Sequence, residues 1–531
     1  MRLLLIILIL SAIYFVRFTN PSLFDWDEIN FAESAREMIV TGDYLRVQID
    51  YKPFHEKPPL FIWLQVLSMK TFGINEYAAR LPNAVIGIIS MIVLFLFGKK
   101  IKDEKFSTYW VAAFAGSFLP TFYFMSGIID PLFNILMFGS VIQLYFYYKN
   151  GQKSLRVLIA SLLISLAVLT KGPVAILLIG ITWLLFSIFN KDFYKIKISH
   201  FLIFLILGIA PYFIWYTLAY GGEANIVLEF LEYHIRLLTT GDAGHSGPWF
   251  YHFPVLLFGA FPASFFAFKG FKKDKTNDHI LNSFNILLLL VVLFVFSIVK
   301  TKILHYSSLA YFPITFFAAR GIERITKKNF KTGFRLISIF SILILVALVL
   351  FSGLPHFAPD LADMAKDQFT ADILRTNVDP SLTNGLASGS LLLGLLYIYF
   401  GKDLKFSIIF YLVTCALTMY TFSSNGSELV ASYTQRTPIE FYKSKQNEDC
   451  YIEPLSYKTY AHYFYSNRKI ENTASGNGMK YSEFLEKLLE GDIDKPAYFV
   501  TKSTKFKKYT TKYDLEIIEN KNGWVFMKRL P

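Results

Sequence analysis

Three carboxylates stand together near the start of the chain, in the sequence Asp25-Trp26-Asp27-Glu28. Apolar runs that can enter a membrane lie on both sides of this region. A charged side chain beside a bilayer is energetically costly, which makes it a functional candidate. A partly shielded carboxylate can serve as a general base. We therefore predict that Asp27 and Glu28 are catalytic; the alternative is that one of them caps the helix that follows.

A second polar group, His55-Glu56-Lys57-Pro58-Pro59, precedes another apolar segment. A lysine in front of a helix can hold a phosphate with the help of the helix N-terminus. We therefore predict that Lys57 binds one, although a surface ion pair before a turn would give the same pattern. Glu56 could ligate a divalent metal together with a histidine, His55 or His245. Two ligands are few for a metal site, and the sequence indicates no other cofactor.

Further candidates lie where later apolar segments begin or end. Asp130 precedes Pro131, a pattern that suits catalysis but also an ordinary helix start. Lys171 lies between two apolar segments, where a lysine is costly unless its ammonium reaches water or an anion. Arginine suits two-pronged phosphate contacts, so Arg236 is a candidate. The predicted set that holds a lipid phosphate is Lys57, Lys171, Arg236, Lys302 and Tyr306.

The composition indicates a polytopic α-helical membrane protein. Hydrophobic residues make up 54% of the 531 residues and charged residues only 18%, against about 25% in soluble domains. The net charge of +13 does not indicate nucleic-acid binding, because the lysines and arginines lie in short loops between apolar runs. The two cysteines form no CxxC motif, and neither a disulfide framework nor a cysteine-type zinc site is predicted.

About thirteen apolar segments have the composition and length of membrane-spanning helices. The first of them, Met1 to Phe18, resembles a signal peptide without a cleavage site, and we expect it to remain as a membrane helix. The predicted spans are 2–18, 82–98, 106–124, 131–148, 156–170, 173–189, 199–217, 251–268, 281–299, 303–319, 334–352, 386–400 and 406–422.

Charge bias in the loops predicts the orientation. Basic loops alternate along the chain, for example at residues 99–105, 149–156 and 191–197, and such loops face the cytoplasm. The N-terminus is then cytoplasmic. Every candidate site residue falls on the opposite, outer face. There we expect a first outer loop, residues 19–81, with amphipathic helices near 28–39 and 60–72 that lie along the membrane surface.

The chain changes character after residue 422. Residues 423–531 are polar and tyrosine-rich, with predicted strands at 451–453, 497–500, 515–518 and 524–526. Asn520-Lys521-Asn522-Gly523 is typical of a hairpin turn. We predict two domains, a catalytic membrane domain at 1–422 and a small soluble α/β domain at 423–531 on the outer side.

These motifs resemble a known family, the bacterial aminoarabinose transferases and the related protein O-mannosyltransferase-type enzymes. The first outer loop of that family is similar to residues 26–38 (WDEINFAESAREM) and 41–44 (TGDY), and its second motif to residues 54–60 (FHEKPPL) with Trp63. The remaining matches follow in the expected order: residues 130–132, 170–173 and 245–251, and Lys302 with Tyr306.

The resemblance implies a GT-C-type glycosyltransferase that takes sugars from polyprenyl phosphates at the periplasmic face of a bacterial inner membrane. It implies that Asp27 is the essential carboxylate and that Glu56 and Lys57 form a donor-site pair. Asp130, Lys171 and Tyr306 match polar positions near the same cavity; Arg236 is a looser match that we expect to contact phosphate. The acceptor stays open between lipid A, another glycan and a protein.

A flippase or transporter of lipid-linked sugars is the alternative from another class. Transporters place charged sites near the middle of the membrane, often on broken helices in paired repeats. The sequence contains no evident repeat and no charges deep within the apolar segments. The enzyme hypothesis is therefore favoured, with a membrane lipid as donor and no nucleic-acid partner.

Overall fold

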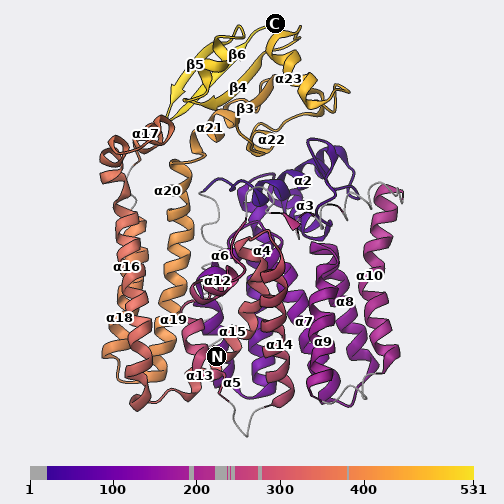
Figure 1. Cartoon of the computed structure of the whole chain (residues 1–531), viewed down its shortest axis with the longest axis vertical. Helices are drawn as coiled ribbons and strands as arrows, with labels where there is room; N and C mark the ends of the chain where they lie inside the picture. Colours follow the sequence, from indigo (N-terminus) through magenta and orange to yellow (C-terminus); the bar gives the residue numbers. More distant parts are fainter. Residues whose placement is uncertain are drawn as a thin grey trace.

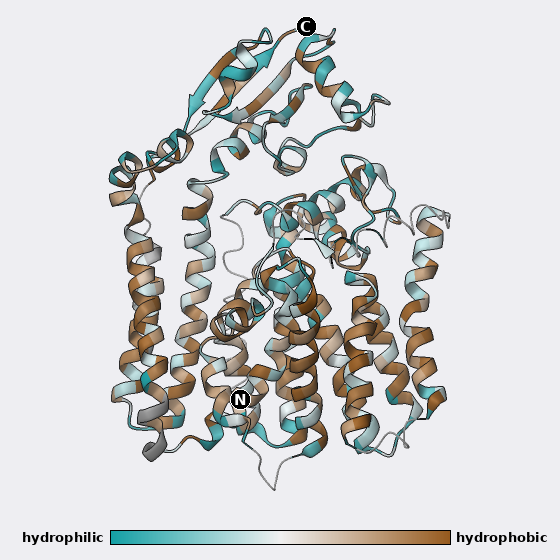
Figure 2. Cartoon of the chain, in the orientation of Figure 1, coloured by the Kyte–Doolittle hydropathy of each residue, from teal (hydrophilic) through white to brown (hydrophobic). Residues whose placement is uncertain are grey.

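The computed structural model describes residues 21–190, 197–221, 232, 236, 239–240, 246–272, 278–378 and 382–531. A bundle of helices occupies one end of the molecule and a small sheet domain the other, with the first outer loop between them (Figure 1). The helices of the bundle are predominantly hydrophobic along their length, and the sheet domain is more hydrophilic (Figure 2). The predicted first helix at 2–18 lies outside the described residues.

The first outer loop contains two helices and a short hairpin. Its elements are α2 (Asp27–Thr41), β1 (Gln48–Ile49), β2 (Lys52–Pro53) and α3 (Leu60–Phe72). The two helices lie at the predicted positions, but the amphipathic character expected for residues 28–39 is wrong. Every residue of α2 from Glu28 to Met38 is buried, because the face expected to meet solvent packs instead against the C-terminal residues.

The bundle is built from helices that match the predicted segments from 82–98 onward. They are α4 (Glu76–Ile101), α5 (Glu104–Ala115), α6 (Phe118–Phe124), α7 (Asp130–Lys149), α8 (Ser154–Lys171), α9 (Val174–Phe189), α10 (Ile198–Tyr220), α12 (His252–Gly259), α13 (Ala263–Gly270), α14 (His279–Ile298), η3 (Leu304–Ala310), α15 (Tyr311–Arg324), α16 (Lys327–Asp363), α18 (Leu382–Phe400) and α19 (Leu404–Thr421). The short helix α17 (Gln368–Leu374) belongs to no predicted span and lies beside the sheet domain (Figure 1).

Three predicted spans are interrupted. Segment 106–124 breaks between α5 and α6, segment 251–268 bends by 101° between α12 and α13, and segment 303–319 begins as a 3₁₀ turn. Among the described residues, six helices are long and apolar enough to cross a membrane, or seven if the bent pair is one span. The chain is thus a polytopic helical membrane protein, and the count of thirteen stays a prediction.

The C-terminal residues form a four-stranded sheet with the order β3-β4-β6-β5, in which only β3 and β4 are parallel. The elements are η4 (Phe422–Gly426), α20 (Ser427–Ser432), α21 (Arg436–Ser444), β3 (Tyr451–Leu455), α22 (Ala461–Tyr465), η5 (Ile470–Asn472), α23 (Tyr481–Glu490), β4 (Ala497–Lys502), α24 (Phe506–Thr510), β5 (Glu516–Lys521) and β6 (Trp524–Arg529).

The hairpin between β5 and β6 has the predicted turn. Asn522 and Gly523 both have positive φ angles, 51° and 78°, as a two-residue type I′ turn requires. Helix α23 packs Phe484 and Leu488 against Phe499 of β4 in a separate small core. The apolar run that begins in α19 continues to Ser432, ten residues beyond the predicted domain boundary at residue 422. The division into two domains at residue 422 stays a prediction.

Candidate active site

Four helix ends meet beneath the first outer loop. Asp27 is the first residue of α2, Asp130 the first of α7, and Lys171 the last of α8, while His305 lies in the opening turn of η3. The placements of Asp27, Asp130 and Lys171 suit the helix dipole, which favours acidic side chains at a helix N-terminus and basic ones at its C-terminus. The chain thereby brings together side chains that are far apart in the sequence.

The imidazole of His305 lies between two carboxylates. Its Nε2 is 3.6 Å from Asp27 Oδ2 and 3.6 Å from Asp130 Oδ2. Lys171 Nζ donates a hydrogen bond to the other oxygen of Asp130. The side chain of Asp130 is only 2% exposed, whereas that of Asp27 is 32% exposed. Asp27 is therefore the carboxylate of this cluster that an incoming molecule can reach.

Positive charge surrounds the cluster. The charges of Lys57 and Lys171 both act on His305, and Lys171 Nζ lies 5.0 Å from the centroid of the Tyr306 ring. Both carboxylates face the same ring nitrogen, Nε2. Because a carboxylate only accepts hydrogen bonds, a proton on Nε2 would lie between the two carboxylates and could be directed to either of them.

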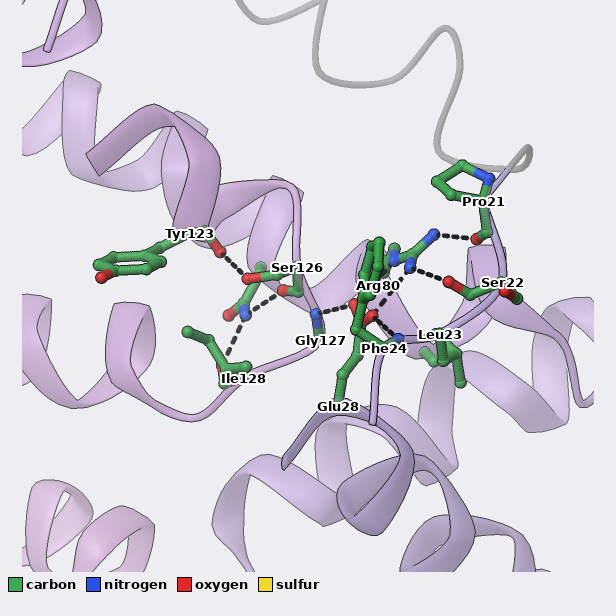
Figure 3. A network of polar contacts seen from close by, with 12 residues as sticks. Pro21, Ser22, Leu23, Phe24, Glu28, Arg80, Tyr123, Ser126, Gly127 and Ile128 are labelled. Carbon is green, nitrogen blue, oxygen red and sulfur yellow. Dashed lines mark hydrogen bonds and ion pairs between the residues drawn. The ribbon is translucent and has the colours of Figure 1, made fainter. Parts of the chain in front are cut away.

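Glu28 points away from this cluster. It forms a two-pronged ion pair with Arg80 of α4, with Nε–Oε1 and Nη2–Oε2 distances of 2.7 and 2.8 Å. Its oxygens also accept the backbone N–H groups of Phe24 and Gly127 (Figure 3). The Glu28 side chain is buried at the junction of three chain segments, away from the position that a reacting hydroxyl would occupy beside Asp27.

The structure also describes two other predicted phosphate-binding residues, Lys302 and Arg236. Lys302 is buried and donates to the carbonyls of Phe296, Ser297 and Val299, so its ammonium is engaged at the C-terminus of α14. Arg236 is exposed, and its carbonyl accepts the N–H of Thr240. Neither side chain has a described contact with the cluster.

The predicted metal ligands are only partly described. His245 lies outside the described residues, and Glu56 is partly buried and close enough to Tyr460 for its charge to act on that side chain. Across the residues that the structure describes, no three His, Cys, Asp or Glu side chains are grouped to hold a metal ion. The Glu56 and His245 metal site stays a prediction.

Sequence reasoning left two residues of the site without a role. His305 was only one member of a polar run, because nothing local distinguishes it from an interfacial histidine. Arg80 was passed over entirely, although an arginine that directly precedes the apolar stretch of a 26-residue helix is costly to bury without a partner and is therefore a signal. Its partner, 52 positions earlier, could not be found by spacing.

An apolar groove of about 740 Å³ lies among the helices of the bundle and includes Leu304 in its lining. Side chains of α6, α12, α16 and α19 line it, together with Tyr251 and Leu304. Leu304 directly precedes His305, so the groove adjoins the charged cluster along the chain. Its walls are almost entirely hydrocarbon, with Phe258, Phe261 and Phe340 among the largest contributors.

Comparison with known proteins finds one family model and several similar proteins. Residues 56–215 match the family model described as dolichyl-phosphate-mannose-protein mannosyltransferase. An undecaprenyl phosphate-α-4-amino-4-deoxy-L-arabinose arabinosyl transferase from Wigglesworthia glossinidia brevipalpis is 26% identical over 64% of this chain and 61% of its own length. The corresponding protein of Shewanella sediminis is 25% identical over 61% of each. The matches thus span about three fifths of these relatives.

The fold is shared along almost the whole chain. The crystal structure of ArnT from Cupriavidus metallidurans bound to undecaprenyl phosphate superposes with a TM-score of 0.77, at 15% identity, over 99% of this chain and 97% of that one. This chain therefore shares the fold of that protein. The family resemblance predicted from the motifs of the aminoarabinose transferases is confirmed.

Proposed function

We propose that this protein is an integral-membrane glycosyltransferase that moves a sugar from a polyprenyl phosphate to an acceptor at the periplasmic face. The observation that carries the proposal is one juxtaposition. The partly exposed Asp27 carboxylate, 3.6 Å from His305, lies among lysines and beside an apolar groove. A base, a phosphate site and a lipid-sized groove are the three parts that such a reaction needs.

In the proposed reaction, a hydroxyl of the acceptor attacks the anomeric carbon of the donor sugar. The bond between that carbon and the phosphate oxygen breaks, and polyprenyl phosphate leaves with both electrons of the bond. Asp27 accepts the proton of the hydroxyl, as a general base must. Attack opposite the leaving group inverts the anomeric centre. No covalent enzyme intermediate is required.

The cations stabilise the leaving phosphate. Lys57 and Lys171 would bind its oxygens, and Tyr306, beneath the Lys171 ammonium, would complete this side of the site. Fixed positive charges in a partly dry site stabilise developing negative charge far better than water does. Arg236 is retained as a phosphate contact from the motif alone, whereas Lys302 is assigned to the C-terminus of α14.

Asp130 and Glu28 are proposed as positioning residues. Asp130 is buried, neutralised by Lys171 and directed at His305, so it holds the imidazole against Asp27. Glu28, predicted as catalytic, is instead buried against Arg80. The change follows from geometry: neighbouring residues at the start of a helix point in directions about 100° apart.

The groove would hold the chain of a lipid substrate. Burial of apolar surface contributes about 25 cal/mol per Å², so a polyprenyl chain there would be bound strongly without any polar contact. Because the groove adjoins His305 through Leu304, a lipid in it could present its phosphate to the cluster. The crystal structure of ArnT contains undecaprenyl phosphate, and we propose the same donor class here.

Orientation and domain roles complete the proposal. We propose an N-terminus in the cytoplasm, about thirteen spans, and residues 423–531 as a periplasmic α/β domain. The acceptor is proposed to be lipid A, as the motif resemblance to the aminoarabinose transferases implies, or another glycan or protein. The comparisons give no support to the flippase alternative.

Purified protein in lipid vesicles tests the function. Undecaprenyl-phosphate sugars would be offered as donors with lipid A as acceptor, and release of undecaprenyl phosphate would be followed together with the glycosylated product. Transfer by the natural protein, lost on Asp27→Asn, is expected. Movement of the labelled donor across the bilayer without any release of sugar would overturn the proposal in favour of a flippase.

A further inference from the structure

Two loops must hold their positions for the active-site cluster to exist. One is residues 21–27, which ends at Asp27, and the other is residues 126–129, which ends immediately before Asp130. Both carboxylates approach the same atom of His305 at 3.6 Å. An error of about 1 Å in such a geometry can reduce a rate about 100-fold, so the element that fixes both loops affects catalysis directly.

That element is α4. Arg80 Nη1 donates to the carbonyl of Pro21 at 2.7 Å and Nη2 donates to that of Ser22 at 3.2 Å. One turn later, Asn83 Nδ2 donates to the carbonyls of Ser126 and Ile128, both at 2.6 Å (Figure 3). A single helical turn therefore contacts the backbone of both loops.

Glu28 links the two attachments. Its Oε1 accepts the N–H of Gly127 at 2.6 Å, while Oε2 accepts the N–H of Phe24 at 2.8 Å. A Cβ at position 127 would lie 3.1 Å from Glu28 Cγ, so the glycine permits this close approach. The carboxylate beside Asp27 is thus bonded to both loops and to the arginine that holds the first.

The pair is fully enclosed. The side chains of Arg80 and Glu28 are 4% and 5% exposed, and the carboxylate has Arg80 as its cationic partner. The arrangement needs the planar fork of arginine, since a lysine ammonium is a single point of charge on a flexible stem. Removing one partner would leave the other charge buried and uncompensated.

We infer that Arg80, through Glu28, is a positioning residue that sets the separation of Asp27 and Asp130 about His305. The expected effect on kcat rests on the proposed function. The expected effect on the positions of the two loops rests on the backbone contacts alone. The inference predicts a loss of turnover without a loss of donor affinity, because Lys57 and Lys171 lie on other parts of the chain.

The kinetic test compares Arg80→Lys and Glu28→Gln in the full-length protein in lipid vesicles. Each is expected to lower kcat at least 10-fold, while the Kd for undecaprenyl phosphate changes less than 3-fold. The double variant should be no worse than the poorer single one, because both act through one pair. A kcat within 2-fold of the natural protein for Arg80→Lys, or a parallel loss of donor binding, would overturn the inference.

Arg320→Lys is the matched control. Arg320 is also a buried arginine, 6% exposed, and donates to Asn282 Oδ1 at 2.6 Å and the carbonyl of Lys272. It lies toward the far end of α15 from the η3 turn that carries His305. Its replacement is expected to leave kcat within 2-fold, which separates positioning from a general effect of burying a lysine.

A second measurement does not depend on any activity. Amide hydrogen exchange in peptides covering residues 22–30 and 124–130 should be at least 10-fold faster in Arg80→Lys than in Arg320→Lys, in both peptides together. Unchanged exchange in either peptide would refute the link between the loops. If the natural protein transferred no sugar, the proposed function would be refuted. The hydrogen-exchange comparison would still show whether Arg80 holds both loops in place.

Discussion

Two clusters of buried charge contact α2, and they differ in whether one charge stays accessible. In the active-site cluster, defined by Asp27, Asp130, Lys171 and His305, the Asp27 side chain is 32% exposed. In the second, here called the interface cluster, the Arg36–Glu33 pair is 2% and 0% exposed and the Arg468–Glu453 pair 4% and 0%. The first cluster can meet a substrate, and the second cannot.

The interface cluster joins the first outer loop to the C-terminal domain. Arg36 Nη2 and the hydroxyl of Tyr51 both donate to the carbonyl of Arg468, at 3.1 and 2.7 Å. The Arg468 side chain in turn pairs with Glu453 of β3. A closed pair of this type fixes one arrangement of two segments, whereas an ion pair with an exposed member can exchange protons. The comparison separates charges that position from charges that react.

The largest expected effect is at the exposed carboxylate. Asp27→Asn should lower transfer about 10³-fold, because the side chain can no longer accept the proton of the acceptor. Undecaprenyl phosphate should still bind, since the lysines remain. Turnover and donor binding would be measured on the same preparation.

Asp43→Asn is its control. Asp43 belongs to the same loop and forms an exposed ion pair with Arg46, so its loss should change turnover less than 3-fold. Equal effects of the two substitutions would remove Asp27 from the role of base.

The phosphate side should give the next largest effect. Lys57→Met or Lys171→Met is expected to weaken binding of undecaprenyl phosphate about 10- to 100-fold, as expected for the loss of one charge-assisted hydrogen bond. Calorimetric titration in detergent would measure it. Lys70→Met is the control, because Lys70 lies on the first outer loop over the Tyr44 ring. Binding that tolerates both active-site substitutions but not Lys70→Met would contradict the assignment of Lys57 and Lys171 as phosphate-binding residues.

A substitution in the interface cluster should lower the stability of the protein more than its turnover. Arg468→Met leaves Glu453 buried without its partner, a change that costs about 3–5 kcal/mol. The melting temperature should fall, while kcat of the folded fraction at low temperature falls less than for Asp27→Asn. A loss of turnover with no change in melting would show that the interface cluster belongs to the reacting site.

The last prediction concerns only stability, as a pH dependence of the unfolding free energy at Asp50, beside the interface cluster. Burial raises the pKa of Asp50 from 3.8 to about 6. Neighbouring charges that act on it are Arg468, Glu453, Lys52 and Glu33. Because the folded state favours the protonated form, this contribution is fully present below pH 3.8 and is lost as the pH rises through 6.

Its size is about 3 kcal/mol, from two pKa units at 1.36 kcal/mol each. Asp50→Asn should therefore flatten the dependence of the unfolding free energy between pH 4 and pH 6.5 and raise the melting temperature at pH 7.5. Melting curves of both proteins across that range would measure it, and parallel curves would show that Asp50 is not the group responsible.

The sequence predicted those residues of the site whose charge is energetically costly at its position in the chain. Asp27, Asp130 and Lys171 are charges at the ends of apolar segments, and such charges are visible without a structure. The contacts between them were not predictable, because His305 and Asp27 are far apart in the chain and meet only through packing. The ion pair of Glu28 was not predictable for the same reason, since its partner Arg80 lies on another helix.

The fold was predictable to a similar depth. Apolar length located the helices, and Asn522-Gly523 located the hairpin of the C-terminal sheet. The breaks within segments 106–124 and 251–268 were not anticipated, although Gly116 and Pro262 lie at them, because Gly and Pro are also frequent inside continuous membrane helices. The burial of α2 was missed because its polar face is covered by residues more than 400 positions away.

The contacts between the first outer loop and the C-terminal domain can form only late in synthesis. Leu23 donates its N–H to the hydroxyl of Tyr465 at 2.6 Å across 442 positions, and Arg36 contacts the carbonyl of Arg468. The helices of the bundle can be made and inserted long before either partner has left the ribosome. A nascent chain therefore holds residues 21–28 through their contacts with α4 well before the C-terminal contacts can form, and we expect a chain truncated before residue 465 to be inserted in the membrane with a less stable first outer loop.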